Sequence, residues 1–187
     1  GLALLPKAPR DDTSLARWML AWPLAHEPIL TAAASAQGVP PHLLWGLARE
    51  ESAFDAAVSS WAGAVGLCQL MPATAREEAR LLRLPRPTHD QLTEPALNAR
   101  LGASHIGRRL RGMGHPLKAI AAYNAGPGAV ARWMPPSGHS VPVDWWVEQI
   151  GYDETRNYVK YVTGSWVTYA LLYDGEAIDY PLDIVGR

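Results

Sequence analysis

Apolar residues recur along most of this chain at the three- and four-residue intervals of amphipathic helices, and proline or glycine separates one such run from the next. We find no internal repeat and no strand of useful length in which apolar and polar residues alternate. The pattern predicts helices over residues 13–20, 25–37, 41–53, 72–84, 94–111, 116–123 and 153–173. We therefore expect an all-α fold.

The same pattern suggests how the chain is organised. Its 187 residues suit one domain with a substantial hydrophobic core. We assign residues 25–173 to that domain, residues 1–24 to a linker or the remnant of a preceding domain, and residues 174–187 to a loop-like C-terminal tail. The proline- and glycine-rich stretch 134–143 is predicted to be a surface loop.

One carboxylate continues an apolar stripe. In the predicted helix 41–53, Glu51 lies four residues after Leu47 and seven after Leu44, and therefore on the same face. A carboxylic acid held against apolar side chains is costly to ionise, so its pKa should rise. A general acid that works near neutral pH requires such a pKa. The alternative is that the flexible glutamate stem reaches an arginine or the surface.

The segment that follows Glu51 has an unusual composition. Residues 56–76 contain no acidic side chain. Gly63 and Gly66 permit tight backbone turns and the close approach of main-chain groups to a ligand. Ser60 and Gln69 add neutral hydrogen-bonding groups. These residues therefore place neutral hydrogen-bonding groups and accessible main chain beside the acid.

Two later segments carry further candidate residues. Tyr123 and Asn124 end a predicted helix just before a Gly-Pro-Gly turn, although an ordinary helix stop would look similar. Glu148 precedes the polar start of the helix 153–173. Along that helix three residues share one face, which could also be purely structural: Glu154, Tyr158 and Tyr161.

Composition narrows the function classes. The net charge of −1, from 17 basic and 18 acidic residues, argues against a general nucleic-acid binder. A single cysteine excludes an intrachain disulfide and leaves the compartment undecided. The chain has no run of about eighteen apolar residues, so no membrane span is predicted. The six histidines lack metal-ligand spacing, and we predict no metal and no cofactor.

Taken together, the segments resemble the catalytic domain of the soluble lytic transglycosylases, the goose-lysozyme-like glycoside hydrolase family 23. Residues 94–102 are similar to the helix between the family's motifs, and the likeness covers roughly residues 25–170. All pieces occur in the family's order, which is far more specific than any one motif. The matching pieces are Glu51-Ser52-Ala53-Phe54, residues 60–74, Ala122-Tyr123-Asn124-Ala125-Gly126-Pro127-Gly128 and residues 154–159.

The resemblance implies a lysozyme-like α fold that acts on the glycan strands of peptidoglycan in the bacterial periplasm or cell envelope. It places Glu51 at the family's catalytic acid, and we expect a monomer. The chain departs from the family pattern in three places. Cys68 replaces a methionine, Ile150-Gly151-Tyr152 stands where Ile-Pro-Phe or Ile-Pro-Tyr is common, and His105 stands where an aromatic residue, often tyrosine, is usual. The substrate-binding residues predicted in this way are Ser60, Gln69, Met71, Thr74, Tyr123, Asn124, Glu148 and Tyr158.

The predicted reaction is cleavage of the β-1,4 bond between N-acetylmuramic acid and N-acetylglucosamine, with formation of a 1,6-anhydro ring. Glycosidases usually need a second carboxylate, and the loop after Glu51 lacks one. One alternative is a goose-type lysozyme, in which Asp55, Asp144 or Glu148 activates water. Another is a peptidoglycan-binding module without catalysis. Finally, the Cys68 thiol either lines the expected cleft or is buried and inert.

Overall fold

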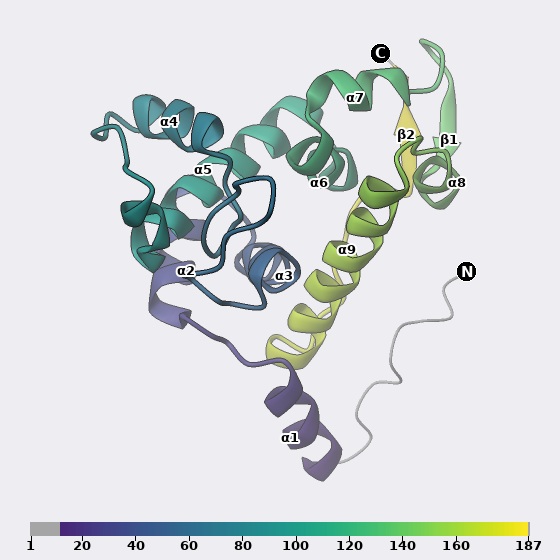
Figure 1. Cartoon of the computed structure of the whole chain (residues 1–187). Coiled ribbons are helices and arrows are strands. Elements are labelled where there is room, and N and C mark those ends of the chain that lie inside the picture. The colour runs from purple at the N-terminus through teal and green to yellow at the C-terminus, as the bar shows by residue number, and fades with distance from the viewer. Residues whose placement is uncertain (1–11, 187) are drawn as a thin grey trace.

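The computed structural model describes residues 12–186. All seven predicted helices are present, with ends that differ by a few residues, and the all-α expectation is confirmed apart from one small sheet. The elements are α1 (Asp12–Ala21), α2 (Glu27–Gln37), α3 (Pro41–Ser52), α4 (Pro72–Leu81), the 3₁₀ turn η1 (Asp90–Thr93), α5 (Pro95–Met113), α6 (Pro116–Ala125), α7 (Pro127–Arg132), β1 (Ser140–Pro142), α8 (Val143–Glu148), α9 (Asp153–Tyr173) and β2 (Asp183–Val185) (Figure 1).

The small sheet corrects two expectations. β1 and β2 pair antiparallel, with Val141 opposite Ile184. The prediction of a surface loop over 134–143 is therefore wrong at residues 140–143, where β1 and the start of α8 lie, and the prediction of a loop-like tail is wrong at 183–185. Three-residue strands are too short to show alternation, and their pairing depends on a partner about 40 residues away in the chain.

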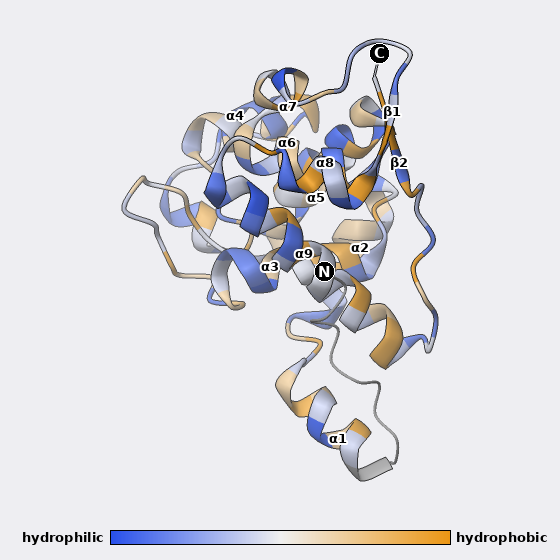
Figure 2. Cartoon of the chain, turned by 90° about the vertical axis from the view of Figure 1, so that its right-hand side faces the viewer, coloured by the Kyte–Doolittle hydropathy of each residue, from blue (hydrophilic) through white to orange (hydrophobic). Residues whose placement is uncertain are grey.

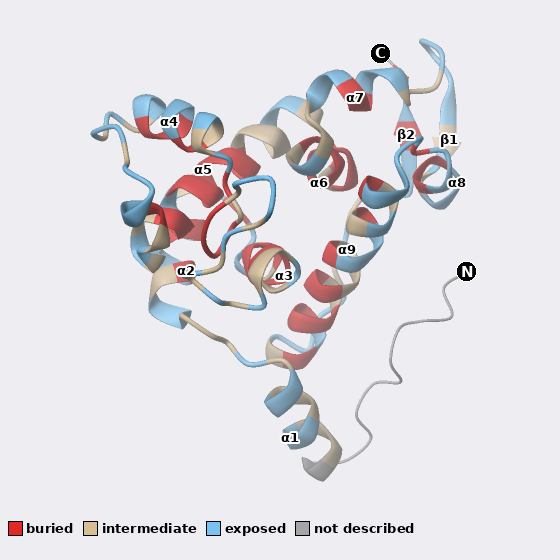
Figure 3. Ribbon diagram, viewed as in Figure 1, coloured by how far each residue is buried: buried red, intermediate tan, exposed pale blue. Residues whose placement is uncertain are grey.

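The centre of the molecule is built from α3, α5, α6 and α9 (Figures 1 and 3). α5 is enclosed along its middle, where every residue from 101 to 107 is buried. α3 packs closely on α9 because Gly46 has no side chain: a Cβ there would lie 2.9 Å from the backbone nitrogen of Trp166. This close approach brings the end of α3 next to the first turns of α9.

Hydrophilic and hydrophobic residues are mixed along the helices (Figure 2), as expected for helices that bury one face and expose the other. α1 lies at the edge of the molecule beyond the last turn of α9, and none of its described side chains, at residues 14–21, is buried. Trp22, just after α1, packs edge-on against Tyr169 with ring centroids 5.4 Å apart. Within residues 12–186, the helices lack the combination of length and apolar character that crossing a membrane requires.

Candidate active site

Glu51 lies in the last turn of α3, where the chain leaves the helix sharply. Ala53 and Phe54 have φ values of 49° and 67°, in the left-handed region, and they turn the chain into the following loop. The hydroxyl of Ser52 lies 3.0 Å from the carbonyl oxygen of Ala48 and 2.9 Å from that of Leu67. The hydroxyl has one proton, which it can donate to either carbonyl oxygen, so Ser52 links the end of α3 to the loop.

The carboxyl group of Glu51 has the predicted environment. Burial raises its pKa from 4.5 to about 7; a hydrogen bond from Tyr158 opposes this rise, and the nearby carboxylates Glu154 and Glu50 add to it. The Tyr158 hydroxyl donates to Oε1 of Glu51 at 2.6 Å. The raised pKa expected from the sequence is thus confirmed, and the hydrogen-bond partner of this acid is a tyrosine rather than an arginine.

The loop after α3 is held by its own polar groups. Two isolated bridges, between Ser59 and Val65 and between Val65 and Leu70, fold it back on itself. The Ser60 hydroxyl accepts a hydrogen bond from the Ala64 amide at 3.0 Å. The Gln69 amide nitrogen lies 3.1 Å from the Val58 carbonyl oxygen and 2.9 Å from that of Gly66. Ser60 and Gln69 therefore fix the shape of the loop.

The loop leads directly into α4. Met71 is 44% exposed and immediately precedes α4, and Thr74 is partly buried in the first turn of that helix. These residues could contact a ligand that covers the loop.

One face of α5 packs against the loop. The side chain of Asn98, which is completely buried, accepts a hydrogen bond from the Cys68 amide at 2.8 Å and donates to the carbonyl oxygens of Val65 and Leu92. One turn later, a Cβ on Gly102 would lie 2.4 Å from the sulfur of Cys68. Sequence reasoning missed Asn98; the available signal was an amide on the apolar face of a predicted helix.

The structure decides between the two expectations for Cys68. Its side chain is 0% exposed, and burial raises the pKa of its thiol far above the ordinary value. The thiol is therefore buried and does not line a cleft. The position still matters, because the negative charge of Glu51 also acts to raise the Cys68 pKa, so the two groups are neighbours.

The two predicted tyrosines meet at this point. Tyr123, at the end of α6, donates a hydrogen bond to the Cys68 carbonyl oxygen at 2.7 Å. Burial raises the pKa of both Tyr123 and Tyr158 well above 10, and Glu51 contributes to both shifts. Asn124 accepts a hydrogen bond from the hydroxyl of Thr155 and so ties α6 to α9. Glu51, Tyr123, Tyr158 and Cys68 thus form one cluster.

Glu148 lies apart from this cluster. Its carboxylate is exposed and pairs with Lys160 at 2.7 Å and with Arg156 at 4.0 Å. Each of these cations is two residues from Tyr158 on α9, and residues two apart on a helix point about 160° apart. Glu148 therefore pairs with side chains that leave α9 on the opposite side from Tyr158.

The other carboxylates considered as water activators have local partners. Asp55 accepts a hydrogen bond from the Ala57 amide at 2.9 Å, which closes the turn after α3. Asp144 accepts one from the Trp145 amide at 2.8 Å, within α8. Both side chains are exposed. Within residues 12–186, no group of three His, Cys, Asp or Glu side chains is arranged to hold a metal ion.

The chain is similar in sequence to one family model and to several named proteins. The sequence model of the transglycosylase SLT domain matches residues 28–140. The soluble lytic murein transglycosylase of Escherichia coli K12 is 35% identical over 143 residues, which are 75% of this chain and 22% of that protein. The protein of the same name from Salmonella typhimurium is 36% identical over 143 residues, with the same coverage.

The fold is also similar to solved structures of lytic transglycosylases. An inactive mutant of the lytic transglycosylase Slt from Pseudomonas aeruginosa superposes with a TM-score of 0.81 at 33% identity, covering 90% of this chain and 30% of that one. The 70 kDa soluble lytic transglycosylase of Escherichia coli superposes with a TM-score of 0.76 at 30% identity, covering 86% and 26%. The chain thus spans less than a third of the length of these relatives.

Proposed function

The chain belongs to the transglycosylase SLT domain family, and we propose that it is a peptidoglycan lytic transglycosylase. Residues 25–173 form its catalytic domain, with the lysozyme-like fold of the family. Its substrate is the glycan strand of peptidoglycan, and it acts as a monomer in the bacterial periplasm or cell envelope. The proposed chemistry requires no metal and no cofactor.

Glu51 acts first as an acid and then as a base. Its proton passes to the glycosidic oxygen between N-acetylmuramic acid and N-acetylglucosamine, and the bond from that oxygen to C1 of the muramic acid breaks. The 2-acetamido group of the same sugar stabilises the positive charge at C1. Ionised Glu51 then takes the proton of the C6 hydroxyl, whose oxygen bonds to C1 and closes the 1,6-anhydro ring.

A single observation supports this proposal most strongly. The pKa of Glu51 is about 7, so the protonated and ionised forms have similar free energies near neutral pH. A group that must give up a proton and then take one back works best at such a pKa. A fully solvated glutamate, with a pKa near 4.3, would rarely carry the proton needed for the first step.

The surrounding residues are assigned supporting roles. Tyr158 holds the carboxyl group of Glu51 through its 2.6 Å hydrogen bond. Tyr123 lies beside the reacting centre, and Ser60, Gln69 and the main chain of residues 66–69 orient the sugar that bears the acetamido group. The remaining members of the predicted set are proposed as substrate contacts away from the breaking bond: Met71, Thr74, Asn124 and Glu148.

Two alternative functions make different predictions. A goose-type lysozyme would need Asp55, Asp144 or Glu148 to activate water, yet each has a hydrogen bond or ion pair elsewhere. A peptidoglycan-binding module would gain nothing from a partly buried acid whose pKa is raised to about 7. Product chemistry separates these functions: anhydro ends from a transglycosylase, reducing ends from a lysozyme, and no fragments from a binder.

The test compares Glu51→Gln with Glu50→Gln on purified peptidoglycan. The first change keeps the size of the side chain but removes the proton, and we expect the release of fragments to fall by about a thousandfold or more. Glu50 is exposed and accepts a hydrogen bond from Ser165, so its variant should retain activity within a few-fold. Near-normal cleavage by Glu51→Gln, or reducing ends in the mass spectra of wild-type products, would refute the assignment.

A further inference from the structure

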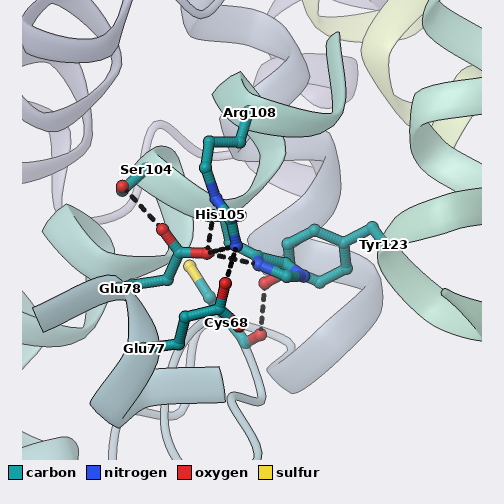
Figure 4. A network of polar contacts seen from close by, with 7 residues as sticks. All are labelled: Cys68, Glu77, Glu78, Ser104, His105, Arg108 and Tyr123. Atoms are coloured by element: carbon teal, nitrogen blue, oxygen red, sulfur yellow. Dashed lines mark hydrogen bonds and ion pairs between the residues drawn. The ribbon is translucent and has the colours of Figure 1, made fainter. Parts of the chain in front are cut away.

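A buried network of polar side chains lies next to the site but takes no part in the proposed chemistry (Figure 4). Its centre is Glu78 of α4, which is 0% exposed. Oε2 of Glu78 accepts a hydrogen bond from Ser104 at 2.8 Å. Oε1 accepts one from Nδ1 of His105 at 2.7 Å and two from Arg108, at 3.1 Å and 2.6 Å. All of these donors belong to α5.

The network fixes the charge of Glu78 and the direction of its hydrogen bond with His105. Burial by itself would raise the pKa of Glu78, but the hydrogen bonds from His105, Arg108 and Ser104 together lower it to about 2. The carboxylate is therefore ionised near neutral pH and can only accept hydrogen bonds. Because it faces Nδ1 of His105, that nitrogen must carry a proton.

His105 in turn contacts Tyr123. The imidazole is 5% exposed, and its ring meets the Tyr123 ring edge-on, with centroids 4.9 Å apart and an angle of 68° between the planes. The hydrogen bond to Glu78 prevents rotation of the imidazole, so the surface offered to Tyr123 is fixed. Edge-to-face contacts depend on orientation, and a ring that rotated freely would hold its neighbour less well.

Tyr123 passes this constraint to the loop beside Glu51. Its hydroxyl proton is donated to the Cys68 carbonyl oxygen, so the phenolic oxygen offers only lone pairs to any other partner. The Cys68 amide is held by Asn98 from the same helix that carries His105. Both polar groups of this peptide segment are thereby fixed from α5 and α6.

We propose that His105, held by Glu78, is a positioning residue that sets Tyr123 and the Cys68 backbone against Glu51. The effect on reaction rate rests on the proposed transglycosylase function, whereas the effect on the loop does not. A buried ionic network adds little net stability compared with apolar packing of the same volume. The feature that this network supplies is instead the fixed orientation of one imidazole ring.

Cys68 provides a reporter for the test. It is the only cysteine of the chain and is fully buried, so a small thiol reagent can reach it only when the segment opens. The rate of labelling in the native protein measures local opening, and urea unfolding measures global stability separately. The two readouts require neither substrate nor activity.

Two variants separate the parts of the contact. His105→Phe keeps a ring against Tyr123 but has no donor for Glu78, whose carboxylate retains Arg108 and Ser104. His105→Asn keeps a donor and loses the ring edge. The matched control is His115→Phe: His115 is also a buried imidazole, lies 2.8 Å from the Pro181 carbonyl oxygen and meets Tyr180 edge-on.

We expect both His105 variants to label Cys68 at least about tenfold faster than their global unfolding explains, and His115→Phe to label in proportion to its unfolding. On peptidoglycan, kcat of the His105 variants should fall by about tenfold while KM changes less. Labelling of both His105 variants that follows global stability, as in the control, would overturn the proposal. A wild-type chain without transglycosylase products would refute the proposed function alone and leave the labelling result to decide this one.

Discussion

The hydroxyl of Tyr158 on α9 donates a 2.6 Å hydrogen bond to Oε1 of Glu51 on α3, across 107 residues of sequence. Packing of α3 on α9 at Gly46 makes this contact possible. The hydrogen bond favours the ionised form of Glu51, whereas burial favours the protonated form. The pH at which Glu51 gives up its proton is therefore a balance between two opposing and separable effects.

Removing the hydrogen bond should shift the pH profile upward. In Tyr158→Phe the ionised form of Glu51 loses a donor, so its pKa should rise by about one unit above the wild-type value of about 7. The reaction begins with protonated Glu51, so the fall of kcat/KM at high pH should move upward by the same amount. Tyr161→Phe, an exposed position on the same helix, is the control and should leave the profile in place.

Removing a neighbouring charge should have the opposite effect. Glu154 raises the pKa of Glu51 by charge repulsion. In Glu154→Gln the pKa should fall by a few tenths of a unit, and the high-pH fall of kcat/KM should move downward. The effect should shrink in about 1 M salt because the site of the change is exposed. A shift in the same direction as Tyr158→Phe would contradict this account; Asp153→Asn, one residue earlier, is the control.

The raised pKa of Glu51 also predicts how stability depends on pH. The folded protein holds this proton up to about pH 7, whereas an unfolded chain releases it near 4.5. Between these values the folded state binds more protons, so its stability falls as the pH rises. Glu51→Gln lacks this titration. As the pH rises from about 4 to about 8, its free energy of unfolding relative to that of the wild type should therefore increase by on the order of 1–3 kcal/mol.

Urea unfolding of Glu51→Gln and of the wild type at about pH 4 and about pH 8 measures this change in relative stability. Glu50→Gln, at the adjacent exposed position, leaves the Glu51 carboxyl in place and should keep most of the wild-type pH dependence, with the Glu51 pKa slightly lower because the Glu50 charge helps to raise it. A constant difference between Glu51→Gln and wild type across this range would mean that burial does not raise the pKa of Glu51.

Two glycines of α5 give a test of packing at the site. A Cβ on Gly102 would lie 2.4 Å from the Cys68 sulfur, so Gly102→Ala must displace the loop and should cost about 1–3 kcal/mol or more. Gly112 has nothing within 4 Å of its Cβ position, and Gly112→Ala should gain up to about 1 kcal/mol from helix propensity. Urea unfolding compares the two, and only Gly102→Ala should also lower activity. Equal effects at both positions would contradict the close contact between α5 and the loop.

The long helices were predictable because their pattern is local. Helices 41–53 and 153–173 each contain several turns of amphipathic spacing, and both are present within a residue. The place of Glu51 on an apolar stripe and the direction of its pKa shift followed from the same spacing. The short elements α7, α8, β1 and β2 were missed because three to six residues carry too little periodicity.

Local patterns in the amino-acid sequence were therefore enough to predict the helical framework, the candidate acid and the loop that follows it. Only the packing of the folded chain established that Tyr158 is the partner of Glu51, that the Cys68 thiol is buried, and that Glu148 pairs with Lys160. It also brought Glu78 and His105 together from different helices. The reason is physical: helix periodicity depends on residues three or four apart, whereas these contacts depend on how helices distant in sequence pack together.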